Sequence, residues 1–204
     1  MKKESPKIDV KPKVIIAMAV QDTIKSKTAL SLICALREAE FDYDIIMSMG
    51  CDLIGSRTRL VKMAIEKGGT HMLFLDHDMM LNPTPNMAGK MVDPITQLLK
   101  HDKDIIGAAY NFRSLPLRPT CFPLSDLSDK TGLYRCNAIG TGFMLIKLSV
   151  FDKIAKPWFN FARNAEAEMV YGEDAWLCKQ AIEAGFEVWA DGSLKVGHLG
   201  EFEY

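Results

Sequence analysis

The sequence lacks an excess of charge of either sign, because its 25 Lys and Arg side chains are balanced by 26 Asp and Glu side chains. This balance argues against a protein that binds nucleic acid or anionic lipid through bulk positive charge. The five cysteines are scattered and never spaced as Cys-x-x-Cys, which argues against a disulfide framework or a cysteine-based zinc site and favours a reducing compartment. The phosphate-loop pattern GxxxxGKS/T and the dinucleotide pattern GxGxxG are also missing.

Long hydrophobic runs are missing as well. The apolar stretch 14–20 ends at Gln21, which makes it too short for a signal peptide or a membrane-spanning helix. We therefore expect a cytoplasmic protein with no membrane span. Residues 1–13 contain prolines and lysines and are expected to form a flexible tail, whereas the length of the chain predicts one domain over 14–204.

What the chain does have is a repeated alternation of short apolar runs and amphipathic segments. This alternation predicts an α/β fold, a Rossmann-like α/β/α sandwich around a mixed, mostly parallel central sheet. Such sheets bind their ligands at the carboxyl ends of the strands. The expected strands are 14–20, 43–49, 71–75, 104–110, 138–147 and 187–190, and the expected helices are 28–40, 57–67, 94–101, 148–154 and 174–184.

Two carboxylates follow the expected strand 71–75, in the segment MLFLDHDMM. Asp76 and Asp78 are two residues apart, so in extended backbone both side chains can face one site. Two adjacent negative charges are costly unless a cation neutralises them, and a hard divalent ion would also accept a diphosphate. The alternatives are that Asp76 caps a helix while Asp78 is solvated, or that the pair is the DxD of a haloacid-dehalogenase-type phosphatase. The latter fits less well, because two strands precede the motif and Met79 follows it.

Two further motifs carry groups suited to catalysis. Glu173 and Asp174 start the expected helix 174–184, where acidic residues are also common simply as caps. His198 stands between glycines in the segment VGHLG, which lets an imidazole reach inward. An imidazole beside carboxylates suits Mn²⁺ better than Ca²⁺.

Taken together and in this order, five segments resemble the small GT-A-fold glycosyltransferases, similar to the family 2-like enzymes that use nucleotide-sugar donors. The resemblance covers roughly residues 14–200. It is carried by SRTRLVKMAIEKGGTHMLFLDHDMM, HDKDIIGAAYNFR, AIGTGFMLIKLSVFDKI with PWF, YGEDAWLCKQAIEAGFEVWAD and VGHLG.

The resemblance implies a metal-dependent hexosyl- or pentosyltransferase that moves a sugar from a nucleoside-diphosphate sugar, most simply a UDP-sugar, to an acceptor hydroxyl with inversion. Asp174 would be the general base, and Glu173 would shape the acceptor site beside it. Mn²⁺ or Mg²⁺ would stabilise the leaving diphosphate. The implied metal-binding residues are Asp76, Asp78 and His198, and the implied donor-binding residues are Val20, Asp22, Arg57, Asp76, Gly140, Thr141 and Gly142.

The acceptor and two other functions stay open. The acceptor can be a saccharide, a protein or a nucleic acid base. Trp158 and Phe159 are either an aromatic platform for it or packing residues, and Arg113 and Arg118 either hold an anion or are solvated. A sugar-nucleotide nucleotidyltransferase is an alternative, although the Gly-rich signature of that class is missing near the first strand. A non-catalytic nucleotide-sugar-binding module is the other, although all the expected catalytic side chains are present.

Overall fold

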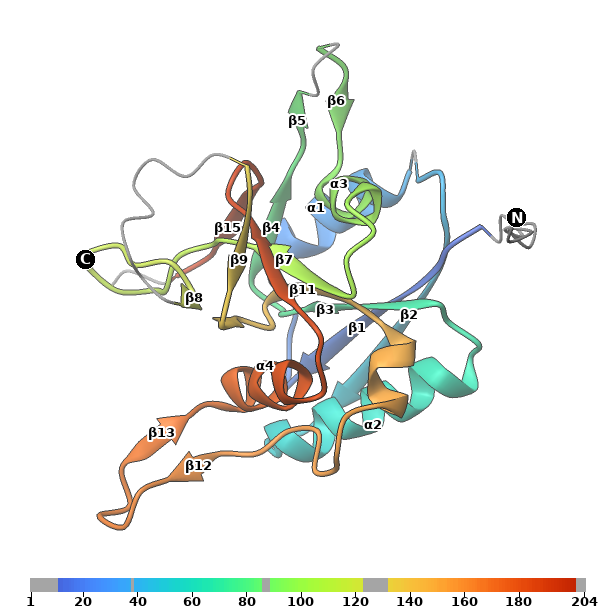
Figure 1. Ribbon diagram of the computed structural model, residues 1–204. Helices are drawn as coiled ribbons and strands as arrows, with labels where there is room; N and C mark the ends of the chain where they lie inside the picture. The colour runs from blue at the N-terminus through green and yellow to red at the C-terminus, as the bar shows by residue number, and fades with distance from the viewer. Residues whose placement is uncertain (1–10, 38, 86–88, 123–131, 201–204) are drawn as a thin grey trace, which may run out of the picture.

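A seven-stranded sheet forms the centre of the protein in the computed structural model, which describes residues 11–37, 39–85, 89–122 and 132–200 (Figure 1). Helices cover both faces of this sheet, so the predicted α/β/α sandwich is confirmed. The strands, in their order across the sheet, are β2 (Asp42–Met49), β1 (Lys13–Val20), β3 (His71–Leu75), β11 (Phe143–Lys147), β7 (Ile105–Ala108), β14 (Val188–Asp191) and β9 (Leu133–Cys136).

The strand directions bring several strand ends to one edge of the sheet. Strand β1 is parallel to β2 and β3, and β7 is parallel to β14. Strand β11 lies antiparallel between β3 and β7, and β9 is antiparallel to β14, so the sheet is mixed. Because β3 and β7 both oppose β11, they run in the same direction. The carboxyl ends of β1, β2, β3 and β7 therefore lie along the same edge, which is where such sheets bind ligands.

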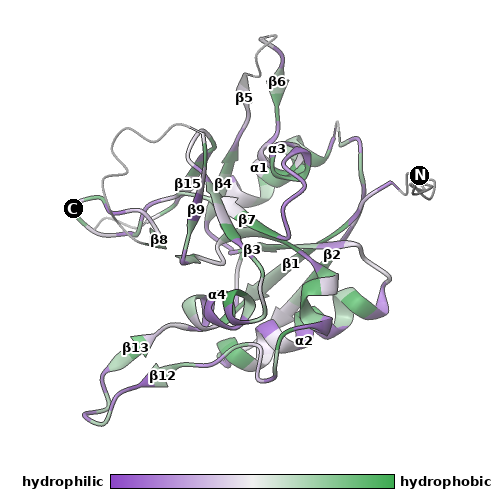
Figure 2. Ribbon diagram, viewed as in Figure 1, coloured by the Kyte–Doolittle hydropathy of each residue, from purple (hydrophilic) through white to green (hydrophobic). Residues whose placement is uncertain are grey.

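Each face of the sheet has its own hydrophobic core. The helices α2 (Leu53–Glu66) and α4 (Glu173–Glu183) pack on one face, and α1 (Ser26–Leu36) and α3 (Pro94–Lys100) pack on the other (Figures 1 and 2). Strand β1 shows why both faces are covered, since Ile15 points into the first core and Ile16 into the second, and both are fully buried. A continuous apolar run of this kind is typical of a strand buried on both sides.

Several short elements lie outside the central sheet. Two hairpins stand away from the body, one formed by β5 and β6 and the other by β12 and β13 (Figure 1). These shorter elements are β4 (Met79–Asn82), β5 (Thr84–Pro85), β6 (Met91–Val92), β8 (Cys121–Phe122), β10 (Ala138–Ile139), the 3₁₀ helix η1 (Leu148–Asp152), β12 (Ala162–Arg163), β13 (Met169–Tyr171) and β15 (Lys195–His198).

Several predicted boundaries are wrong for local reasons. Helix α2 begins four residues before the predicted 57, because the Asp52 side chain caps it by accepting a 3.0 Å hydrogen bond from the Gly55 N–H. The predicted strand 138–147 is two strands, β10 and β11, separated by the turn at 140–142. Residues 1–10 of the predicted tail lie outside the described residues, and Lys13 already belongs to β1.

Among the described residues, we find no helix with the length and apolar character needed to cross a membrane.

Candidate active site

The carboxyl ends of β1, β2 and β3 surround a cleft of about 290 Å³. Val20 contributes from β1, Arg57 from α2, and Asp76 from the turn after β3, so three of the residues predicted to bind a donor line one cavity. Ser56 and His77 line it too. Asp22, which was also predicted to bind the donor, is exposed and is not part of this lining.

Arg57 links the two acidic motifs. Its Nη2 atom lies 3.6 Å from Oδ1 of Asp76 and 3.2 Å from Oε1 of Glu173, and its side chain is 4% exposed. The guanidinium also lies over the ring of Phe74, 5.6 Å from the centroid. Among the described residues, its Nε–H is buried without a hydrogen-bond partner. A buried donor of this kind is normally satisfied, so the Nε–H is a candidate contact for a bound ligand.

Asp78 lies on the other side of the same turn and is almost fully buried. Its Oδ2 atom lies 2.8 Å from Nη1 of Arg113 and 3.5 Å from Nε2 of His198. Burial alone would raise the pKa of the carboxyl group, but the hydrogen bond with His198 and the positive charge of Arg113 outweigh it, so the pKa is lowered. Asp78 is therefore held as a carboxylate.

Strand pairing explains why His198 reaches Asp78 across so much of the chain. Strand β4 follows the DHD segment directly and pairs with β15, which places His198 opposite Met79. The Leu199 N–H then donates a 2.8 Å hydrogen bond to the Asp78 carbonyl, which secures the chain at this point. The sequence places His198 and Asp78 in different motifs, and the fold makes them neighbours.

The imidazole of His198 is oriented by a backbone carbonyl. Its Nδ1 atom lies 3.0 Å from the Asn111 oxygen, and because a carbonyl only accepts hydrogen bonds, Nδ1 carries the proton. Nε2 faces the Asp78 carboxylate: when Nε2 is protonated it donates the hydrogen bond to that carboxylate, and when the ring is neutral it presents a lone pair there instead. Two facing acceptors favour a cation, and two ligands at right angles on an ion about 2.1 Å away lie about 3 Å apart. The observed 3.5 Å separation suits this arrangement.

Asp76 does not join these two groups. Among the described residues, no three His, Cys, Asp or Glu side chains come close enough to hold a metal ion together. Asp78 and His198 thus form a two-ligand set, and Asp76 is paired with Arg57 instead. Divalent ions such as Mg²⁺ are commonly bound by one or two protein ligands together with substrate phosphates and water, so the pair fits a metal that arrives with a diphosphate.

The turn at 140–142 lies against Asp76, since the Asp76 N–H donates a 3.0 Å hydrogen bond to the Gly142 carbonyl. Tyr110 supports this turn: its Oη atom accepts a 2.9 Å hydrogen bond from the Gly142 N–H. A Cβ at Gly140 or Gly142 would lie only 2.3 or 2.5 Å from that oxygen, so both positions require glycine. The Tyr110 ring also packs edge-on against His198, with 5.5 Å between the centroids.

The second acidic motif begins helix α4. Burial raises the pKa of Asp174 and of Glu173, although the charge of Arg57 opposes the rise in both. Asp174 lines a groove of about 830 Å³ between α4, β8, β10 and β13. Its Oδ1 atom accepts a 2.7 Å hydrogen bond from the Ala175 N–H. A Cβ at Gly172 would lie 2.9 Å from this oxygen, so the absence of a side chain there leaves room for the carboxylate.

Three residues after β7 organise the site; sequence reasoning missed two of them and left the role of the third open. Tyr110 and Asn111 position the 140–142 turn and His198, and Arg113 pairs with the Asp78 carboxylate while its side chain stays about half exposed. Their shared signal is position, because all three follow β7, whose carboxyl end lies at the site edge. Trp158 and Phe159 are buried in the core, which confirms the packing interpretation and excludes an acceptor platform there.

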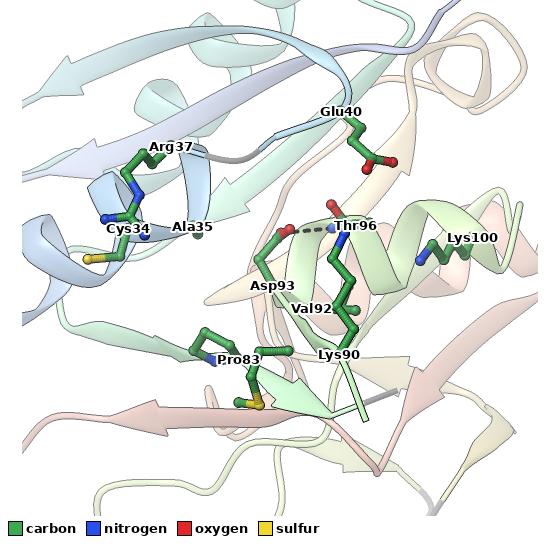
Figure 3. Close-up of a pocket in the computed structure, with 11 residues that line it drawn as sticks. Cys34, Ala35, Arg37, Glu40, Pro83, Lys90, Val92, Asp93, Thr96 and Lys100 are labelled. Atoms are coloured by element: carbon green, nitrogen blue, oxygen red, sulfur yellow. Dashed lines mark hydrogen bonds between the residues drawn. The ribbon is translucent and has the colours of Figure 1, made fainter. Parts of the chain in front are cut away.

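A separate cavity of about 380 Å³ lies between α1, α3 and the arm formed by β5 and β6 (Figure 3). Its polar lining includes Arg37, Glu40 and Lys100. The Asp93 carboxylate there caps α3 by accepting a 2.9 Å hydrogen bond from the Thr96 N–H. None of the residues predicted to bind donor, acceptor or metal lines this cavity, so we assign it no part in the site.

Comparison with known proteins supports the fold and gives no evidence on the activity. No family model matches the chain, and no curated protein is significantly similar in sequence. The crystal structure of A197 from STIV is similar with a TM-score of 0.60, over 93% of this chain and 86% of A197. The two chains share a fold. At 19% sequence identity, the similarity carries no information beyond that fold.

Proposed function

We propose that this protein is a glycosyltransferase that moves a hexose or pentose from a nucleoside-diphosphate sugar to an acceptor hydroxyl. The observation that carries the proposal is the position of Arg57. Its one guanidinium contacts both Asp76, in the cleft at the end of β3, and Glu173, next to Asp174 in the groove of α4. A donor in the cleft and an acceptor in the groove would therefore meet at one place.

On this proposal, the nucleoside occupies the cleft lined by Val20, Arg57 and Asp76. The 140–142 turn, whose Gly142 carbonyl accepts a hydrogen bond from the Asp76 N–H, would lie near the transferred sugar. Mn²⁺ or Mg²⁺ held by Asp78 and His198 would stabilise negative charge on the leaving diphosphate.

Asp174 acts as the general base. The acceptor oxygen forms a bond to the anomeric carbon while the bond from that carbon to the diphosphate oxygen breaks. The electron pair of the broken bond leaves with the diphosphate, and Asp174 takes the hydroxyl proton. Such proton transfer contributes typically ~10²–10⁴-fold in rate, and a carboxylate with a raised pKa is a stronger base than an ordinary one. In-line displacement inverts the anomeric centre.

The proposal is tested by titrating UDP- and GDP-sugars into the protein in a calorimeter, with and without Mn²⁺, and by following release of the nucleoside diphosphate. We expect binding that is selective for one nucleotide and enhanced by the metal. Asp78→Ala should abolish the metal dependence, whereas Asp174→Asn should bind the donor and lose turnover. Absence of diphosphate binding in the wild-type protein would refute the proposal. Binding without turnover under all acceptor conditions would favour the non-catalytic binding module instead.

A further inference from the structure

The groove that Asp174 lines is walled mainly by apolar side chains that are exposed. Phe112 and Phe122, 43% and 40% exposed, stand on one side, and Val170 and Tyr171, 54% and 37% exposed, stand on the other. Val170 and Tyr171 belong to β13, on the hairpin that projects from the body, where the ribbon has the hydrophobic colour (Figure 2). Apolar side chains from separate segments that gather around one concavity mark a binding surface rather than scattered exposure.

The charges of the groove largely cancel. At its outer end, Lys179 and Glu183 pair with each other at 2.5 Å on successive turns of α4. Apart from this pair, Asp174 is the one carboxylate or cationic side chain among the described lining residues, and it follows Glu173, which pairs with the buried Arg57. The lining thus has no surplus cation to attract a phosphate or another anionic group, and it offers a single carboxylate to a hydroxyl.

From these features we infer that the acceptor is a small neutral molecule with an aromatic ring body and a hydroxyl group. The ring packs between Phe122 and Val170, where aromatic and aliphatic faces are available to it, and the hydroxyl points to Asp174. A cavity of about 830 Å³ suits a ligand of that size. A polyhydroxylated sugar matches the lining less well, because most of the groove surface is apolar and its polar groups, such as Asn137, are fewer than the hydroxyls of a sugar would need. The role of Asp174 in this inference rests on the proposed function.

Binding of the acceptor is measured with 4-methylumbelliferone, a fluorescent phenol, titrated into the full chain without donor and without metal. We expect saturable binding to the wild-type protein. Phe122→Ala should weaken the binding about fivefold to tenfold, the effect of losing one aromatic contact. Phe161→Ala is the matched control, since Phe161 is also a half-exposed aromatic residue but does not line the groove, and it should leave the affinity unchanged.

A second variant guards against a folding defect at Phe122. Val170→Glu places a negative charge on the exposed hairpin and should also weaken binding of the phenol, while circular dichroism of both variants matches the wild type. The polar alternative is tested by methyl β-glucoside as a competitor, which should not displace the phenol. Displacement by the glucoside, or equal affinity of all variants for the phenol, would overturn the inference.

This experiment is independent of the donor titration. Phenol binding in the groove without any nucleotide binding would refute the proposed glycosyl transfer and support the inference that the groove binds an aromatic molecule. Nucleotide-sugar binding and turnover without phenol binding would support the proposed glycosyl transfer and refute the inference of an aromatic acceptor.

Discussion

Arg113 and Asp78 form a 2.8 Å ion pair on Oδ2 of Asp78, the same atom that faces His198. The guanidinium therefore stands where a metal ion would approach the carboxylate. Because the Arg113 side chain is about half exposed, it can leave without opening the core.

Arg113→Ala should consequently raise the affinity of the protein for Mn²⁺. We expect an increase of about fivefold to tenfold, the size of one partly exposed charge-assisted contact. The measurement is a Mn²⁺ titration followed by electron paramagnetic resonance without donor. Arg118→Ala is the control, since Arg118 lines the same cavity beside His198 but does not form the ion pair with Asp78. An unchanged or lower affinity in Arg113→Ala would show that Arg113 and the metal do not compete.

Arg57 is expected to be essential for the stability of the fold. In Arg57→Met, the carboxylates of Asp76 and Glu173 lose their shared counter-charge, and breaking a buried ion pair costs about 3–5 kcal/mol. Partial exposure of Asp76 places our expectation at the lower end, about 3 kcal/mol. Urea unfolding followed by circular dichroism measures the loss.

Arg135→Met is the matched control for that substitution. Arg135 pairs with Glu187 at 3.1 Å on the surface, and exposed pairs of this kind contribute less than about 1 kcal/mol. Equal effects of the two substitutions would mean that Arg57 contributes no more than a surface residue.

The raised pKa of Asp174 predicts a dependence of stability on pH. Burial makes the folded protein hold this proton more tightly than the unfolded chain does, so the associated stability is complete below the unfolded pKa of about 3.9 and is lost as the pH rises through the folded pKa. Asp174→Asn is neutral at every pH and avoids the loss. Its melting temperature should exceed that of the wild type at about pH 8 and approach it near pH 4.

The same substitution should abolish turnover, so Asp174 would favour function at the cost of stability. Asp42→Asn is the control, because the exposed pair of Asp42 with Lys11 should change the melting temperature little at either pH. A melting temperature of Asp174→Asn that falls further below the wild type as the pH rises would contradict the prediction.

Gly142→Ala should displace Tyr110, whose ring packs against His198 in the site. The added Cβ would lie 2.5 Å from Oη and 2.8 Å from Cζ of Tyr110, so the ring would have to move away from His198. We expect a loss of about 1–3 kcal/mol in the free energy of unfolding, together with weaker Mn²⁺ binding. At Gly200 an added Cβ meets no described atom within 4 Å, so Gly200→Ala should leave both quantities unchanged.

The sequence predicted the central elements well because their signals are local. The apolar runs of β1 and β3 are buried on both sides, and Asp76 follows β3 as the fold class requires. The short strands β4 and β15 could not be predicted, since four residues of pairing leave no periodic pattern. Yet this pairing is what brings His198 to Asp78.

For the site, the sequence predicted individual residues but not the contacts between them. Arg57 was expected to touch a donor, and nothing in its helical neighbours indicated that it also reaches Glu173. Similarly, the aromatic pair Trp158 and Phe159 could not be assigned to surface or core from residue type. The walls of the groove come from four separate segments of the chain, and their meeting depends on tertiary packing.

Because Arg57 uses a single Nη2 atom for both Asp76 and Glu173, the two halves of the site share one contact. A nucleotide that donates hydrogen bonds to the Asp76 carboxylate would leave Arg57 free to pair with Glu173 alone, which would stabilise the start of α4. If the proposed glycosyl transfer is correct, substrates should then add in a compulsory order, sugar nucleotide first. Product-inhibition kinetics reveal that order, with the released nucleoside diphosphate competing against the sugar nucleotide alone.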